Sequence, residues 1–266
     1  MKSERIETIH LPDPPGAASL GSLGDGVRAH WHMPPADVTA AGPGLVVLPI
    51  QGGDYEISTL FARHFAAHGH HCLRFERRAE WLDATRPPAA LGTLLRTFRD
   101  DVRRGIDWWL ESAPVGLDLG LFGVSMGAMS GILVAANEPR IGSAMLVMGG
   151  GPLSEVLGTA RDREINLFRA ELAARLGVTE PDLVPLFREA LKGLDPLEHA
   201  HGLDASTTLM VSSRFDRVVR YQYQTRLWEA LGKPRRSVLP CGHYSATLFV
   251  PWIKRLALRW FSSNDR

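Results

Sequence analysis

Apolar residues follow two alternating patterns along the middle of this chain. Short runs of strand character, of which the continuous apolar run at 45–50 is typical of a strand covered on both faces, lie at residues 45–50, 71–75, 117–122, 143–148 and 207–211. Segments with the apolar spacing of helices lie at residues 58–68, 89–111, 128–136, 221–231 and 248–261. Strands that alternate with helices at this spacing predict βαβ units and a mostly parallel central sheet flanked by helices.

The two ends of the chain add shorter strands to this sheet. Residues 5–11 and 27–34 have the character of two edge-type strands, and the Gly/Ser/Asp-rich residues 21–26 predict the turn between them. Residues 236–239 predict a last short strand.

The alternation stops after three glycines at 149–151. From residue 153 to about 194 the pattern is helical without a strand, with Leu167, Leu172, Leu176 and Phe187 as its apolar positions. We interpret residues 152–200 as a small helical cap inserted within one domain that spans 1–266, because two or three successive helices exceed one crossover. The alternative is an elongated ordinary crossover.

Composition excludes several classes of protein. The chain has 266 residues and a formal net charge of +1, so nothing points to nucleic acid or an anionic membrane as a partner. No apolar run is long enough to span a bilayer, and the first residues contain no apolar signal core, which predicts a cytoplasmic protein. Two cysteines imply no disulfide framework. The oligomeric state stays open.

The most informative motif is Gly-Val-Ser-Met-Gly at 123–127, which follows one predicted strand and precedes a predicted helix. Strand, sharp turn and helix is the context that a G-x-S-x-G nucleophile requires. Glycines two residues before and after Ser125 leave room for a tight backbone approach. The bare pattern is short enough to occur by chance, so its weight depends on finding partners for the serine.

A base and an acid both follow later strands. Asp216 comes shortly after the strand 207–211, and His243 follows the strand 236–239. Catalytic groups of doubly wound sheets lie in loops at the carboxyl ends of strands. A serine hydroxyl needs a base that takes its proton and a third group that orients the base. The order Ser125, Asp216, His243 meets this need.

Other carboxylates are weaker candidates for the acid. Asp195 and Asp204 do not directly follow a strand. For Asp216 and His243 themselves, the alternatives are a solvated loop carboxylate and a core or loop histidine.

With these motifs the chain resembles the α/β-hydrolase superfamily, from about residue 45 to residue 261. Ser125, Asp216 and His243 resemble its triad, and the short cap is similar to the esterase and dienelactone-hydrolase-like branches. The resemblance implies an α/β-hydrolase fold and hydrolysis of small-molecule carboxylic esters through an acyl-enzyme, without a cofactor. A serine peptidase or thioesterase on the same triad is one alternative. A non-catalytic binding protein that keeps the fold is another.

The mechanism also needs two backbone N–H donors for the oxyanion. Met126, directly after the nucleophile, is expected to supply one. The loop after the strand 45–50 is expected to supply the other. Many relatives have His-Gly there, whereas this chain has Ile-Gln-Gly-Gly, so Gly53 is the first candidate and Gln51 the second.

A histidine-rich stretch invites a metal interpretation. His68, His70, His71 and Cys72 stand close together, but a glycine between helix and strand scatters their directions, and adjacent strand residues point to opposite faces. Because no usual zinc spacing is present, we predict no metal site.

Charged and aromatic residues near the predicted cleft are interpreted as structural. Glu76, Arg77 and Arg78 are expected to form a salt-bridge cluster near the rim, with binding of a substrate carboxylate as the alternative. Trp81, Trp108 and Trp109 are expected to be packing residues rather than a ligand platform.

Overall fold

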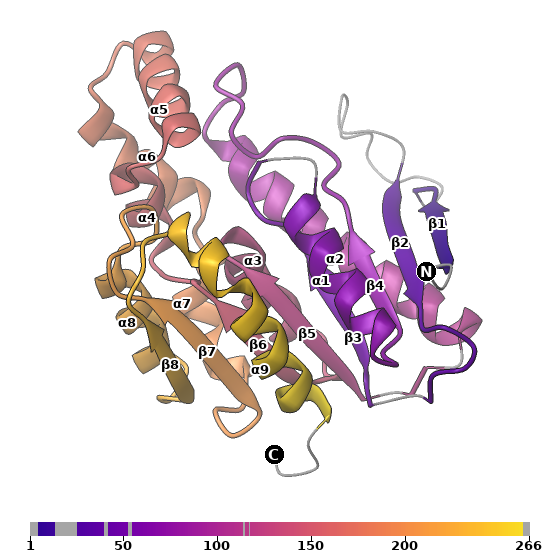
Figure 1. Cartoon of the computed structure of the whole chain (residues 1–266). Coiled ribbons are helices and arrows are strands. Elements are labelled where there is room, and N and C mark those ends of the chain that lie inside the picture. Colours follow the sequence, from indigo (N-terminus) through magenta and orange to yellow (C-terminus); the bar gives the residue numbers. More distant parts are fainter. Residues whose placement is uncertain are drawn as a thin grey trace.

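A computed structural model describes residues 5–13, 26–39, 42–52, 55–113, 115–116 and 118–262. In these ranges the chain forms an eight-stranded sheet in the order β1-β2-β4-β3-β5-β6-β7-β8 (Figure 1). Its strands are β1 (Arg5–Leu11), β2 (Val27–Met33), β3 (Gly44–Leu48), β4 (Cys72–Phe75), β5 (Leu119–Val124), β6 (Ile141–Val147), β7 (Thr208–Ser213) and β8 (Arg235–Leu239). The pairs β1–β2 and β2–β4 are antiparallel, and every other pair is parallel.

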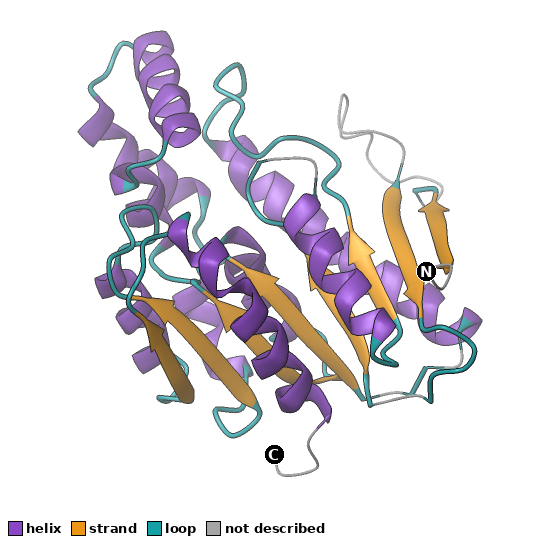
Figure 2. Ribbon diagram, in the orientation of Figure 1, coloured by secondary structure: helices purple, strands orange, loops and turns teal. Residues whose placement is uncertain are grey.

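Helices cover both faces of the sheet (Figure 2). They are α1 (Glu56–Ala67), α2 (Ala89–Ser112), α3 (Met126–Ala135), α4 (Leu153–Thr159), α5 (Arg163–Leu176), α6 (Leu183–Ala190), α7 (Pro196–His199), α8 (Tyr221–Ala230) and α9 (Val250–Ser262). Short 3-10 helices are η1 (Glu180–Asp182), η2 (Ala200–Gly202) and η3 (Ser245–Phe249). The predicted mostly parallel α/β architecture is confirmed.

Two hydrophobic cores result from this layering. One lies between the sheet and α2, α3 and α8, and the other between the sheet and α1 and α9. The central strands β3 and β7 are buried at every residue, as parallel strands with helices on both faces require.

The helices α4, α5, α6 and α7 stand between β6 and β7, and we refer to residues 152–200 as the helical segment. Figure 1 shows α4, α5 and α6 beyond the carboxyl ends of the central strands. Leu172 and Phe187 are fully buried as expected, but Leu167 and Leu176 are 52% and 37% exposed. The prediction was wrong for these two leucines, because they lie on the outer side of α5.

Several boundaries differ from those expected. The strand β2 pairs with both β1 and β4, so it is internal, and only β1 is an edge at that side. The strand β3 ends at Leu48 because Pro49 has no N–H to donate. The helix α3 begins at Met126, two residues earlier than predicted. Of the turn expected at 21–26, residues 21–25 lie outside the described ranges.

No helix in the described part of the chain has both the length and the apolar character needed to cross a membrane.

Candidate active site

Ser125 is the single residue between β5 and α3, and its backbone conformation is unusual. Its φ is 53° and its ψ is −117°, a region that a residue with a side chain rarely occupies. Its N–H donates to the carbonyl oxygen of Val147 (2.7 Å), and its own carbonyl accepts from the first turn of α3. Strain of this kind persists only where the surroundings hold it.

Both flanking glycines are sterically required at this turn. A Cβ on Gly123 would lie 2.3 Å from the carbonyl oxygen of Gly127. A Cβ on Gly127 would lie 2.8 Å from the carbonyl oxygens of both Leu48 and Pro49. The small residues of the motif therefore let α3 begin directly against the end of β3, with Ser125 at the tip of β5.

Asp216 and His243 form a close pair after β7 and β8. The His243 Nδ1–H donates to Asp216 Oδ2 at 2.7 Å. The other oxygen, Oδ1, accepts from the backbone N–H groups of Val218 (2.8 Å) and Val219 (2.9 Å). The Asp216 side chain is 0% exposed and that of His243 is 14% exposed. A buried carboxylate with two backbone donors is held in one orientation toward the imidazole.

Gln224 on α8 completes the surroundings of this carboxylate. Its Nε2–H₂ donates to the carbonyl of Val219 (2.7 Å) and lies 3.3 Å from Asp216 Oδ2, while its Oε1 accepts from Ser213 N (3.0 Å). The residue is fully buried. The pattern of the sequence did not predict this position of Gln224 beside the carboxylate. The available signal was a polar residue on the buried face of an amphipathic helix, between Tyr223 and Leu227.

A cavity of about 420 Å³ brings these elements together. Ser125, Met126, Gln51 and His243 all line it. Most of the remaining lining is apolar and comes from α1, α2, α4, η3 and α9, together with the loop that carries Trp81. Ser125 and His243, from two distant parts of the chain, thus line one cavity at the carboxyl edge of the sheet, and Asp216 is connected to it through its hydrogen bond with His243.

No protein-family profile matches the sequence, and a search of curated proteins finds no match. Solved structures, however, match it over almost its whole length. An acetyl xylan esterase from Paenibacillus sp. R4 is 16% identical with a TM-score of 0.70, over 98% of this chain and 89% of that one. A Mycobacterium tuberculosis puromycin-hydrolyzing peptidase is 17% identical with a TM-score of 0.68, and a Pyrococcus horikoshii acylaminoacyl peptidase is 13% identical with a TM-score of 0.62.

The chain has the α/β-hydrolase fold. The match covers 97% of it in both peptidases but spans only 39% and 40% of their lengths. In an α/β-hydrolase fold the nucleophile follows a central strand and the acid and base follow later strands in the order Ser, Asp, His. Ser125 after β5, Asp216 after β7 and His243 after β8 occupy such positions.

The candidate oxyanion residues lie at two places. Met126 is the first residue of α3, where backbone N–H groups have no partner within the helix, and it is 7% exposed. Gln51 is half-buried and lines the cavity, and Gly53 lies outside the described residues. The carbonyl of Ile50, next to Gln51, accepts from Arg77 Nη1 at 2.8 Å, which anchors this loop.

The three charged residues form salt bridges, as predicted, but with separate partners rather than as one cluster. Glu76 pairs with Arg74 at 3.4 Å, Arg77 with Glu80 at 3.1 Å, and Arg78 with Asp101 at 2.5 Å. None of the three, Glu76, Arg77 or Arg78, lines the cavity.

The tryptophans separate into two groups. Trp109 is fully buried and packs in the core, as predicted. Trp81 is buried and packs edge-on against Phe98, as predicted, and it also lines the cavity. Its loop joins β4 to α2, and loop side chains cannot be assigned to a cavity from their sequence pattern.

The remaining candidates are held elsewhere. Asp195 accepts from the backbone N–H groups of Leu153 (2.6 Å) and Leu197 (3.0 Å), which fixes the starts of α4 and α7. Asp204 accepts from Ser206 within its own turn. Each therefore stabilises local structure.

The histidine-rich stretch has separate partners. His70 Nδ1 lies 3.0 Å from the carbonyl of Pro43, and His71 Nδ1 accepts from the indole N–H of Trp31 at 3.1 Å. In the described ranges no group of three or more His, Cys, Asp or Glu side chains is arranged to hold a metal ion.

Proposed function

We propose that this protein is a serine hydrolase that cleaves carboxylic esters through Ser125, His243 and Asp216. The observation that carries the proposal is that His243, paired with Asp216 at 2.7 Å, lines the same cavity as Ser125, whose φ is 53°. A hydroxyl becomes nucleophilic when an oriented base can take its proton.

The chemistry follows from this arrangement. Ser125 Oγ bonds to the acyl carbon while its proton passes to His243 Nε2. The C–O bond to the alcohol then breaks, and His243 returns the proton to the departing oxygen. A water molecule repeats both steps on the acyl-enzyme, releasing the acid and restoring Ser125. Asp216 holds the imidazole in one tautomer and stabilises its charged form.

The developing oxyanion needs two N–H donors in a dry site. We assign one to the Met126 backbone, whose N–H is at the start of α3. For the second, Gln51 is the candidate that lies in the described part of the loop after β3, and it lines the cavity. Gly53 stays a prediction from the sequence.

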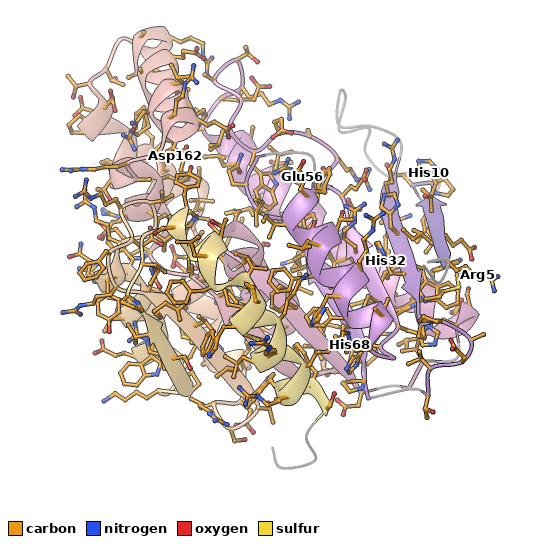
Figure 3. All side chains as sticks on the ribbon, viewed as in Figure 1. Arg5, His10, His32, Glu56, His68 and Asp162 are labelled. Atoms are coloured by element: carbon orange, nitrogen blue, oxygen red, sulfur yellow. The ribbon has the colours of Figure 1, made fainter. Side chains whose placement is uncertain are left out.

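We further propose that the helical segment, residues 152–200, acts as a cap over the site. Leu153, Val156, Leu157 and Ile165 from this segment line the cavity. Tyr244, next to His243, donates a hydrogen bond to Asp162 at the start of α5. Burial, the hydrogen bond to Asp162 and the charge of that carboxylate raise the pKa of Tyr244 well above its usual range. Figure 3 places Asp162 below α5, where the segment faces the sheet.

Amide hydrolysis by the same triad is the alternative, because two of the structural neighbours are peptidases. An ester is favoured because the walls of the cavity are apolar and offer few partners for a peptide backbone, whose unpaired polar groups are costly to bury.

Labelling with a fluorophosphonate probe tests the proposal. The probe bonds to a serine that its neighbours have activated, so wild type should be labelled and Ser125→Ala should not. Hydrolysis of p-nitrophenyl acetate should fall at least about 10⁴-fold in the same variant. The matched control is Ser130→Ala, which removes a buried hydroxyl bonded to the Met126 carbonyl one turn along α3. A folded wild type that neither reacts with the probe nor hydrolyses the ester would instead support the non-catalytic binding protein.

A further inference from the structure

The cavity has apolar walls from both sides of the sheet. One wall, the α2-side wall, belongs to the core on the α2 and α3 face and consists of Trp81, Leu91, Leu95, Leu157 and Leu191. The other, the α9-side wall, belongs to the opposite core and consists of Ile57, Phe61, Ala246, Val250 and Ile253.

Ser125 lies between these walls. It follows β5, a strand at the centre of the sheet, whereas each wall extends from the core on one face. An ester bound with its carbonyl carbon at Ser125 has two substituents, the acyl chain and the alcohol. The two walls offer one apolar surface for each.

Polar side chains are concentrated at the rim of the cavity. Asp162, Arg163 and Glu164 come from the start of α5 and are half-buried or exposed, and Tyr244 is 65% exposed. In the two walls, by contrast, only the Trp81 indole carries a hydrogen-bond donor. Sugar hydroxyls or a peptide backbone at these walls would lose their water without gaining partners.

The size of the cavity suits a small molecule. A volume of about 420 Å³ lies in the range of small-molecule sites, which leaves room for a substituent on each side of an ester.

We propose, on the basis of the proposed function, that the substrates are carboxylic esters with an apolar group on both sides, acyl and alcohol. One wall binds the acyl chain and the other binds the alcohol. This substrate class differs from the acetylated xylan and the acylated peptides that the names of the structural neighbours mention.

The first experiment measures kcat/KM of the wild type with two ester series. One series lengthens the acyl chain of a methyl ester, and the other lengthens the alcohol of an acetate. Acetylated xylo-oligosaccharide and an acylaminoacyl p-nitroanilide complete the panel. We expect kcat/KM to rise in both series by up to about fourfold per methylene, the value for a fully buried CH₂, and to exceed that for the sugar and the amide.

The second experiment places a larger side chain in each wall separately, which narrows the cavity beside that wall. Leu157→Trp takes up cavity space beside the α2-side wall, and Val250→Trp takes up space beside the α9-side wall. Each variant should remove the dependence of kcat/KM on chain length in one ester series and keep it in the other. Leu167→Trp on α5 and Leu248→Trp on η3 are the matched controls, because both leucines are exposed, at 52% and 80%, and lie outside the cavity lining. Both control variants should keep the wild-type increase of kcat/KM with chain length in both ester series.

The outcomes separate this inference from the proposed function. If probe labelling and acetate hydrolysis depend on Ser125 while both series stay flat, or if the sugar acetate or the amide is preferred, the substrate class is wrong and the serine hydrolase stands. If kcat/KM of the wild type rises with chain length in both series, and neither Leu157→Trp nor Val250→Trp changes this dependence, the assignment of the walls is wrong. If a variant does not fold, the wild-type panel still decides the substrate class.

Discussion

The carboxyl edge of the sheet and the helical segment above it are held in different ways. At the edge, Ser125 and Asp216 are fixed by backbone groups: the Val147 carbonyl for one, and the Val218 and Val219 N–H groups for the other. The helical segment is held mainly by side chains: Leu172 and Phe187 are fully buried in the core, and Arg169 donates to the carbonyls of Leu157 and Ala160.

This difference separates two tasks of the site. The proposed reaction needs atoms placed to within fractions of an ångström, and short loops at strand ends supply that rigidity. The walls that contact a substrate need shape rather than atomic precision, and side-chain packing can supply it. Changes at the edge should therefore lower turnover, and changes in the helical segment should alter stability and substrate preference.

Outside the proposed triad, the largest effect is expected at the edge, from Gly127→Ala. The new Cβ would lie 2.8 Å from the carbonyl oxygens of Leu48 and Pro49, so α3 must shift and carry Ser125 with it. A displacement of about 1 Å costs on the order of 10²-fold in rate. We expect kcat on an acetate ester to fall by about that factor. Gly116→Ala is the control, since nothing lies within 4 Å of its Cβ position. Unchanged kcat in Gly127→Ala would show that this end of α3 is not rigid.

A smaller effect is expected from Gln224→Leu, which keeps the burial but removes the hydrogen bonds to Ser213, Val219 and Asp216. The Asp216 carboxylate would lose one of the groups that orient it, and kcat should fall by about 10-fold with little change in KM. The exposed Gln222→Leu on the same helix is the control. An equal rise in KM with unchanged kcat would argue against an orienting role.

In the helical segment, Arg169→Met should act mainly on stability. The guanidinium donates to the carbonyls of Leu157 (2.9 Å) and Ala160 (3.0 Å) and pairs with Glu180 at 2.9 Å. Losing these bonds should lower the free energy of unfolding by about 2–3 kcal/mol. Chemical denaturation measures this, with the exposed Arg188→Met on α6 as control. Turnover of an acetate ester should change less than turnover of a long-chain ester, because Leu157 lines the cavity.

The smallest effect concerns pH. Burial raises the pKa of Asp195, even though the N–H groups of Leu197 and Leu153 lower it in part. The folded state therefore binds this proton more tightly than the unfolded state, in which the pKa is roughly 3.9. The contribution of Asp195 to the free energy of unfolding should fall as the pH rises from the unfolded-state pKa, roughly 3.9, through the raised pKa of the folded state. Above that pH it should stay constant. The difference between wild type and Asp195→Asn, measured against pH, should show this slope. A difference that increases with pH would contradict it.

Local patterns predicted the elements of the fold well. The strand, turn and helix around Ser125 follow from an apolar run, two glycines and a run of small residues. The strand-end positions of Asp216 and His243 follow from strands of ordinary length. The predicted order of strands and helices is confirmed because hydrophobic periodicity is a local signal.

Side chains that act through tertiary contacts were harder to predict. The place of Trp81 in the cavity lining and the hydrogen bonds of Gln224 were not predicted, because their partners come from other elements. The same holds for β2, whose alternating pattern suited an edge strand although β4 pairs with it.

The sequence by itself determined the order of the elements and the candidates for the nucleophile, base and acid, since both depend on neighbours in the chain. Only the tertiary structure decided that Ser125 and His243 line one cavity, that Asp216 pairs with His243, and that this cavity has apolar walls from both faces of the sheet. The reason is physical: strand pairing and helix packing bring distant segments together, and which side chains then meet is a property of the assembled layers.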